Sequence, residues 1–191
     1  MAEPAASRMT YEEYLAAEAV SDTKHEYLRG EVFAMAGGTP THARLAMAVG
    51  VALGNALAGR PCAVFSSDLR VRIEDTDLST YPDLIVVCGS FERAKIDANA
   101  ATNPTLIVEV LSDSTEAYDR GQKFAHYRQL PSLREYLLVS QHEPRLESYF
   151  KNPAGEWVLT EARAGEALAL RSLDGVRLEV DAIYHDPLAG G

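Results

Sequence analysis

Long apolar runs are absent from this sequence, and basic residues are in the minority. No stretch approaches the roughly 18 consecutive apolar residues of a membrane-spanning helix, so we expect no contact with a membrane. The first residues lack a basic start followed by an apolar run, so we expect no secretory signal there. Lys and Arg number 18 against 28 Asp and Glu, which gives a net charge of −10. This balance counts against a broad basic face for nucleic acid, although it allows a local basic groove.

Cysteines and sequence-reading motifs are scarce as well. Cys62 and Cys88 lie far apart, form no CxxC pair and have apolar neighbours. We therefore expect buried free thiols in a reducing cytoplasm. The sequence also contains no helix-turn-helix pattern and no zinc-finger spacing, so these modules for reading a base sequence are not predicted.

Length and hydrophobic pattern predict an α/β fold. The 191 residues, 47% of them apolar, fit a single domain over 1–191, with an ordered core at about 9–185 and loose ends. Capping signals and helical spacing predict helices at 10–18, 41–58, 115–130 and 180–184. Continuous and alternating apolar runs predict a hairpin around Gly30, strands at 62–73, 84–88, 106–111 and 135–140, and weaker strands after residue 145. This order predicts a mixed central sheet flanked by helices, with an antiparallel extension near the C-terminus.

Two carboxylates at predicted buried strands are the first candidates for chemistry. Glu109 lies inside the apolar run 106–111, and Asp83 comes directly before the run 84–88. A carboxylate buried without compensation is costly, so each needs a partner. If the two strands are neighbours, the carboxylates converge, and two hard oxygen ligands suit Mg²⁺ or Mn²⁺. In the structural alternative, one of these carboxylates caps a loop and the other forms an internal ion pair.

A long, ordered series of segments resembles a known family. The segments are HEYLRGEVFAMAG at 25–37, TH at 41–42, YPDLIVV at 81–87, PTLIVEVLSDST at 104–115, DRGQKFAHY at 119–127 and EYLLV at 135–139. They are similar to the Uma-type family of restriction endonucleases, within the PD-(D/E)XK nuclease superfamily. The resemblance covers residues 9–185 and implies a restriction-endonuclease-like fold with a metal-dependent phosphodiester site.

The resemblance assigns roles to several residues. The acid pair of the superfamily falls on Asp83 and Glu109, and Val110 is counted with them at the metal. A lysine usually follows the second acid by two residues, but Leu111 stands at that position. Lys123, on the next predicted helix, is the implied substitute. It would orient water or stabilise the charge that develops on the phosphate.

Two of the implied site residues have structural alternatives. Lys123 could be a solvated helix lysine that pairs with Asp119, four residues earlier. Glu26, from the N-terminal segment, is the candidate for a third acid in the site. An exposed glutamate near a turn is the other interpretation of Glu26, and Glu31 better suits a surface position in the hairpin.

Four more residues are candidates for substrate binding or for support of the site. His42 begins a predicted helix, where it could touch a phosphate, transfer a proton or bond to the backbone. Asp68 and Arg70 lie at alternate strand positions, so they could form a bridging pair beside the site or a surface ion pair. Tyr127 shares a helix face with Lys123 and is expected to pack in the core.

These features predict a cytoplasmic endonuclease that depends on Mg²⁺ or Mn²⁺ and acts on DNA. Asp83, Glu109, Lys123 and Glu26 are the predicted catalytic residues. A nuclease-fold binding or regulatory module without cleavage is the alternative, favoured by the acidic charge and the displaced lysine. A purely structural partner protein would keep Asp83 and Glu109 in ion pairs. By analogy with nucleases that cut two strands with two sites, we expect a homodimer.

Overall fold

The structure is a computed structural model that describes residues 8–35 and 37–188. The sequence predicts loose ends at 1–8 and 187–191. Of these, residues 1–7 and 189–191 lie outside the described residues. The succession of helices and strands confirms the predicted α/β class. That the chain forms a single domain stays a prediction.

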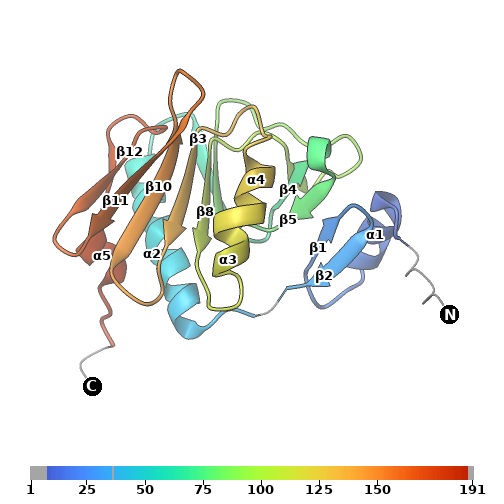
Figure 1. Ribbon diagram of the computed structural model, residues 1–191, viewed down its shortest axis with the longest axis horizontal. Coiled ribbons are helices and arrows are strands. Elements are labelled where there is room, and N and C mark those ends of the chain that lie inside the picture. Colours follow the sequence, from blue (N-terminus) through green and yellow to red (C-terminus); the bar gives the residue numbers. More distant parts are fainter. Residues whose placement is uncertain (1–7, 36, 189–191) are drawn as a thin grey trace.

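A mixed sheet forms the centre of the molecule (Figure 1). Its strands follow the order β11-β10-β9-β8-β6-β3. Their bounds are Cys62–Ser66 (β3), Leu84–Cys88 (β6), Leu106–Val110 (β8), Glu135–Val139 (β9), Arg145–Lys151 (β10) and Trp157–Arg163 (β11). β8 and β9 are parallel, and the other neighbours are antiparallel. The predicted mixed sheet and its antiparallel C-terminal extension are thereby confirmed.

A second sheet has the strand order β2-β1-β5-β4-β7, and a separate hairpin joins β12 to β13. The bounds are His25–Leu28 (β1), Glu31–Ala34 (β2), Arg70–Ile73 (β4), Leu78–Thr80 (β5), Ala100–Ala101 (β7), Ala167–Leu170 (β12) and Val176–Glu179 (β13). Arg29 and Gly30 connect β1 to β2 with φ angles of 51° and 91°. Glycine adopts positive φ without a steric cost, which is why the predicted hairpin turns at Gly30.

The helices begin where the sequence supplies capping residues. Thr10 caps α1 (Tyr11–Glu18) and forms a capping box with Glu13. Thr39 caps α2 (Pro40–Ala56). The predicted helix at 115–130 is present as α3 (Glu116–Tyr118), a π-helical turn (Asp119–Lys123) and α4 (Phe124–Tyr127), and α5 (Val180–Tyr184) follows the last strand. Among the helices described, none has the length and apolar character to cross a membrane.

Both faces of the central sheet are covered, as its continuous apolar runs predict. On one face, Leu106 and Val108 belong to a core shared with α2, α5 and the β12–β13 hairpin. On the other face, Ile107 belongs to a core shared with Tyr127 and with strands of the second sheet. In Figure 1, α3 and α4 lie in front of β8 and α2 lies behind it. Because side chains alternate along a strand, Glu109 points to the face of Ile107 and towards α3 and α4.

One predicted strand is wrong in its extent. The segment 62–73 is not one interrupted strand but two strands, β3 in the central sheet and β4 in the second sheet. A turn closed by a hydrogen bond from the Leu69 N–H to the Ser66 carbonyl separates them. The polar residues that looked like an interruption are therefore the crossing from one sheet to the other.

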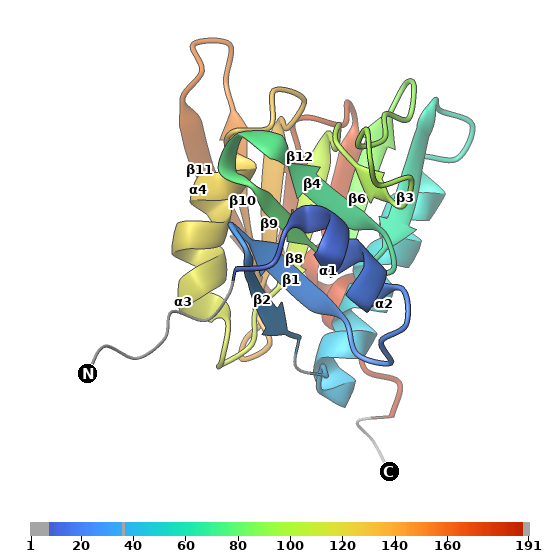
Figure 2. The same ribbon diagram turned by 90° about the vertical axis from the view of Figure 1, so that its right-hand side faces the viewer.

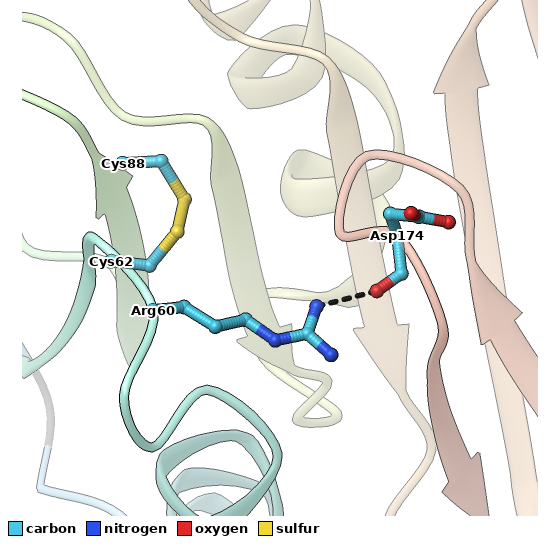
Figure 3. The surroundings of a disulfide bond; sticks show 4 residues. All are labelled: Arg60, Cys62, Cys88 and Asp174. Carbon is cyan, nitrogen blue, oxygen red and sulfur yellow. Dashed lines mark hydrogen bonds between the residues drawn. A yellow bond between two sulfur atoms is a disulfide. The ribbon is translucent and has the colours of Figure 1, made fainter.

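The prediction of free thiols is also wrong, because Cys62 and Cys88 form a disulfide at the edge of the central sheet (Figure 3). The two cysteines are 26 positions apart in the sequence, but antiparallel pairing of β3 with β6 places them directly opposite one another. Strand register cannot be seen in cysteine spacing, which is why the sequence did not reveal the bond. Nearby, the Arg60 guanidinium donates a hydrogen bond of 2.5 Å to the Asp174 carbonyl, between β12 and β13.

Reduction of this disulfide should lower the free energy of unfolding by about 2–4 kcal/mol, because the bond restricts the unfolded chain. The bond lies at the far end of β6 from Asp83, so the surroundings of Asp83 should not change. Urea unfolding with and without dithiothreitol, compared with a Cys62→Ser/Cys88→Ser variant, would measure the effect. Equal denaturation midpoints for the oxidised and reduced protein would contradict this expectation.

Candidate functional site

A pocket of about 550 Å³ opens between the β1–β2 hairpin, the start of α2 and the helical residues that follow β8. Figure 2 shows the hairpin in front of β8, with α3 to its side. The predicted site residues that line this pocket are Glu26, His42, Asp83, Glu109, Val110 and Lys123. The fold thus gathers residues from separate segments of the chain at one place.

The Asp83 carboxylate is fixed at the start of β6. Its Oδ2 accepts a hydrogen bond from the Val110 backbone N–H at 2.7 Å and lies 3.2 Å from His42 Nε2. The hydrogen bond with Asp83 raises the pKa of His42, although burial acts in the opposite direction. A Cβ atom on Gly38 would lie only 2.9 Å from His42 Nδ1, so this glycine leaves the space that the imidazole needs. His42 therefore contacts a predicted metal ligand directly.

The Glu109 carboxylate is buried between β8 and the helical residues in front of it. Its Oε1 accepts a hydrogen bond from the Tyr127 hydroxyl at 2.7 Å and lies 3.0 Å from Lys123 Nζ. Tyr127 packs in the core as expected, and it also holds Glu109 in place. Burial raises the pKa of Glu109, the Lys123 ammonium opposes that shift, and the charges of Asp119 and Asp83 add to it.

Three carboxylates surround the Lys123 ammonium. Lys123 Nζ lies 3.0 Å from Glu109, 3.2 Å from Glu26 and 3.6 Å from Asp119. The lysine side chain is only 7% exposed, so Lys123 is not a solvated helix lysine, although it keeps the contact with Asp119. Burial lowers the pKa of Lys123, but the three carboxylates outweigh burial and raise it well above the ordinary value. Glu26 is also held by a hydrogen bond from the Thr80 hydroxyl.

Asp119 is a residue of this cluster that the sequence did not single out. It lies on the π-helical turn with Lys123, is 3% exposed and lines the pocket. Its Oδ1 accepts no hydrogen bond from any residue that the structure describes. The (i, i+4) spacing to Lys123 was the available signal, but solvated helix faces show the same spacing. In the structure, the burial of both side chains and the π-helical turn, a feature frequent at functional sites, separate the two cases.

The cluster has a surplus of negative charge. Four carboxylates, of Glu26, Asp83, Glu109 and Asp119, face one lysine and one histidine. Their hard oxygen donors are of the kind that Mg²⁺ and Mn²⁺ prefer, and Asp119 Oδ1, which accepts no hydrogen bond from the described residues, is one such donor. In the structure, three of these carboxylates contact Lys123. Among the described residues, 8–35 and 37–188, no three His, Cys, Asp or Glu side chains are placed to bind one metal ion. The donor chemistry fits a divalent cation, and the carboxylates must turn to hold one.

Asp68 and Arg70 are not brought together, so the predicted bridging pair is wrong. Asp68 lies in the turn between β3 and β4 and pairs with Lys24 at 2.6 Å, whereas Arg70 pairs with Asp97 at 2.7 Å. The strand alternation that predicted a common face does not hold, because residue 68 is outside both strands. Arg70 reaches the pocket through Tyr81, whose hydroxyl accepts its hydrogen bond at 2.7 Å.

Comparison with known sequences identifies relatives over most of the chain. Residues 11–181 match a family model described as "Uma2: Putative restriction endonuclease". The uncharacterized protein slr1290 of Synechocystis sp. (strain ATCC 27184 / PCC 6803 / Kazusa) is 40% identical over 177 residues, which cover 93% of this chain and 92% of that protein. The uncharacterized protein sll1609 of the same strain is 37% identical over 153 residues, or 80% of this chain and 86% of that protein.

The fold is similar to that of a crystal structure titled as a putative nuclease belonging to DUF820, from Anabaena variabilis ATCC 29413. The TM-score is 0.73 at 18% sequence identity, and the alignment covers 92% of this chain and 97% of that one. At this identity the similarity concerns the fold alone, and it confirms the predicted restriction-endonuclease-like arrangement. Because the family model matches nearly the whole sequence, the chain belongs to the Uma2 family, described as putative restriction endonucleases.

Proposed function

We propose that this protein is a divalent-metal-dependent endonuclease that hydrolyses phosphodiester bonds in DNA. The observation that carries the proposal is the buried cluster in which Lys123 Nζ lies within 3.2 Å of both Glu109 and Glu26. A structural ion pair needs one carboxylate for one lysine, whereas surplus acids here face an open pocket. Buried charges without full compensation cost stability, so a functional role is the better explanation for them. Membership of the Uma2 family supports the same class of reaction.

The residues of the cluster have distinct proposed roles. Asp83 and Glu109 would hold Mg²⁺ or Mn²⁺, together with the backbone of Val110. A divalent cation bound there polarises a phosphodiester and lowers the pKa of a water molecule. Lys123 would orient the attacking water and stabilise the negative charge that develops on the phosphate. Glu26 would keep the Lys123 ammonium charged and in position.

The support around the cluster has two parts. The Tyr127 hydroxyl would fix the orientation of Glu109, since it donates to Oε1 from a fully buried position. His42 would do the same for Asp83, and its raised pKa favours the charged form that pairs with a carboxylate. Asp119 would add a further acidic oxygen to the pocket.

The proposal also includes a location and an assembly. An enzyme that acts on cellular DNA would work in the cytoplasm, where thiol systems would reduce the Cys62–Cys88 bond. Because that bond lies at the far end of β6 from Asp83, activity should not depend on it. We further propose a homodimer, solely by analogy with nucleases that cut two strands with two sites. A monomeric mass by light scattering would contradict the dimer.

The test is cleavage of supercoiled plasmid and of single-stranded DNA with Mg²⁺ or Mn²⁺, for the wild type and for Asp83→Asn. An Asp22→Asn variant, which changes an exposed aspartate outside the pocket, is the matched control. We expect cleavage that requires the metal, stops with a chelator, disappears in Asp83→Asn and persists in Asp22→Asn.

Two results would contradict the proposal. Equal cleavage by wild type and Asp83→Asn would identify a contaminating nuclease. No cleavage by the wild type, together with no Mn²⁺ binding by calorimetry, would favour a nuclease-fold module that has lost hydrolysis.

A further inference from the structure

An exposed aromatic ring stands at the pocket on β2, an edge strand of the second sheet. Phe33 is 48% exposed, although large apolar side chains are ordinarily buried. Among the residues that the structure describes, neither an aromatic ring nor a cationic group stacks on Phe33. The roles proposed above for the pocket residues do not account for this ring.

Strand register places Phe33 beside the acidic cluster. Phe33 lies directly opposite Glu26 in the antiparallel pair of β1 and β2, so both side chains point to the same face of the sheet. On that face the Glu26 carboxylate lies 3.2 Å from Lys123 Nζ. Phe33 and Met35, the residue that follows the end of β2, both line the pocket. The ring is therefore at the mouth of the proposed active site.

The charge of the pocket limits how a substrate can be held. Lys123 is the one Lys or Arg among the described residues that line it, and its ammonium is already surrounded by carboxylates. Proteins that track duplex DNA do so with many basic contacts to phosphates. A site with so few contacts must obtain binding energy from a cation and from the base itself. An aromatic ring can stack on a base only if that face of the base is not already covered by a neighbour.

We propose that this site takes an unpaired nucleotide, in single-stranded nucleic acid or in an unpaired segment of a duplex, with its base stacked on Phe33. The inference rests on the proposed nucleic-acid substrate and adds that the site selects unpaired over base-paired nucleotides. Tyr118 is a second aromatic residue of the pocket, and burial first, together with the charge of Glu26, raises its pKa to about 12. Two aromatic residues lining one pocket suit a base more than a bare phosphate.

Binding of labelled oligonucleotides would test this proposal, with Ca²⁺ in place of Mg²⁺ to prevent turnover. The probes are a single-stranded DNA, an RNA of the same sequence, and a blunt duplex. The variants are Phe33→Ala and Phe33→Trp, and Leu159→Ala is the matched control because Leu159 on β11 is 49% exposed and lies outside the pocket. Fluorescence anisotropy would give the affinities, and light scattering would give the oligomeric state of each variant.

We expect single strands to bind more tightly than the duplex, and Phe33→Ala to weaken their binding by about 5- to 150-fold. Leu159→Ala should bind as the wild type does. Phe33→Trp should keep the affinity, and its added fluorescence should be quenched by single strands but not by the duplex, relative to the wild type with its one tryptophan. The difference in affinity between the DNA and RNA probes would show which of the two nucleic acids the site prefers.

Two outcomes would overturn the inference. One is an equal affinity of Phe33→Ala and Leu159→Ala for every probe. The other is conversion of a dimer into a monomer by Phe33→Ala with unchanged affinity, which would make the ring a subunit contact. Failure of the hydrolytic function is distinguishable from both. Single strands that bind and quench Phe33→Trp but are never cut would leave the binding inference intact and remove the nuclease.

Discussion

Replacement of Lys123 by methionine should lower the free energy of unfolding of the metal-free protein by about 3–5 kcal/mol, the usual effect of removing one partner of a buried ion pair. The reason is that Glu109 and Asp119 would remain buried without their counter-charge. In the variant these carboxylates would bind protons more tightly than in the unfolded chain. The contribution of these two groups to stability should therefore be fully present at low pH and be lost as pH rises through the raised pKa of Glu109.

The same substitution should reduce the cleavage rate by about 10²- to 10⁴-fold, the effect typical of a lost proton-transfer or charge-stabilising group. Urea unfolding at several pH values and a plasmid cleavage assay would measure the two effects. Lys24→Met is the matched control, because Lys24 pairs with Asp68 in an exposed position, where an ion pair contributes about 1 kcal/mol or less. A Lys123→Met protein as stable and as active as Lys24→Met would show that the cluster is not the active site.

Substitution of Asp83 by asparagine should weaken Mn²⁺ binding by at least about 100-fold, because even residues behind the metal ligands contribute 10- to 100-fold. Asparagine is nearly isosteric, and its side-chain oxygen can still accept the hydrogen bond from the Val110 N–H. The fold should therefore persist, and the melting temperature should stay close to that of the wild type. Removal of the carboxylate should also return the pKa of His42 towards its ordinary value.

Titration calorimetry with Mn²⁺ and an NMR titration of His42 would measure these effects independently of cleavage. Asp22→Asn again provides the control for loss of a negative charge outside the pocket. A large loss of stability in Asp83→Asn, without Mn²⁺ binding in the wild type, would mean that Asp83 is a structural ion-pair residue and not a metal ligand.

Local features of the sequence predict the layered architecture and most of its elements. Continuous apolar runs at 84–88 and 106–111 predicted strands covered on both faces, because a strand with one face in water alternates apolar with polar side chains. Thr10 and Thr39 marked helix starts because their hydroxyl groups satisfy free backbone N–H groups. These features are local, so they can be read from neighbouring residues alone.

The central members of the cluster were also predictable. A carboxylate within an apolar run, as in Glu109, is conspicuous because burial of its charge is costly. The segments that resemble the Uma-type family added Lys123 and Glu26, which spacing alone could not select. The structure brings all three side chains together within a few ångströms.

Other features were decided by tertiary structure alone. The Cys62–Cys88 disulfide depends on the register of β3 against β6, and the position of Phe33 depends on the register of β2 against β1. Asp68 and Arg70 were separated because the chain leaves one sheet for the other at that point. Pairing between distant segments has no signature in the spacing of neighbouring residues.

Glu109 and Glu135 show most clearly what the sequence could not separate. Both are buried glutamates in adjacent strands, and each adjoins a run of apolar residues. The Glu135 carboxylate is satisfied by hydrogen bonds from Ser148 and from the backbone and hydroxyl groups at residues 171–172, away from the pocket. Glu109 instead meets Lys123 at an open pocket. The sequence predicts that each charge is buried, whereas the packing of distant segments decides whether its partners are hydrogen-bond donors away from the pocket or a buried lysine at the pocket.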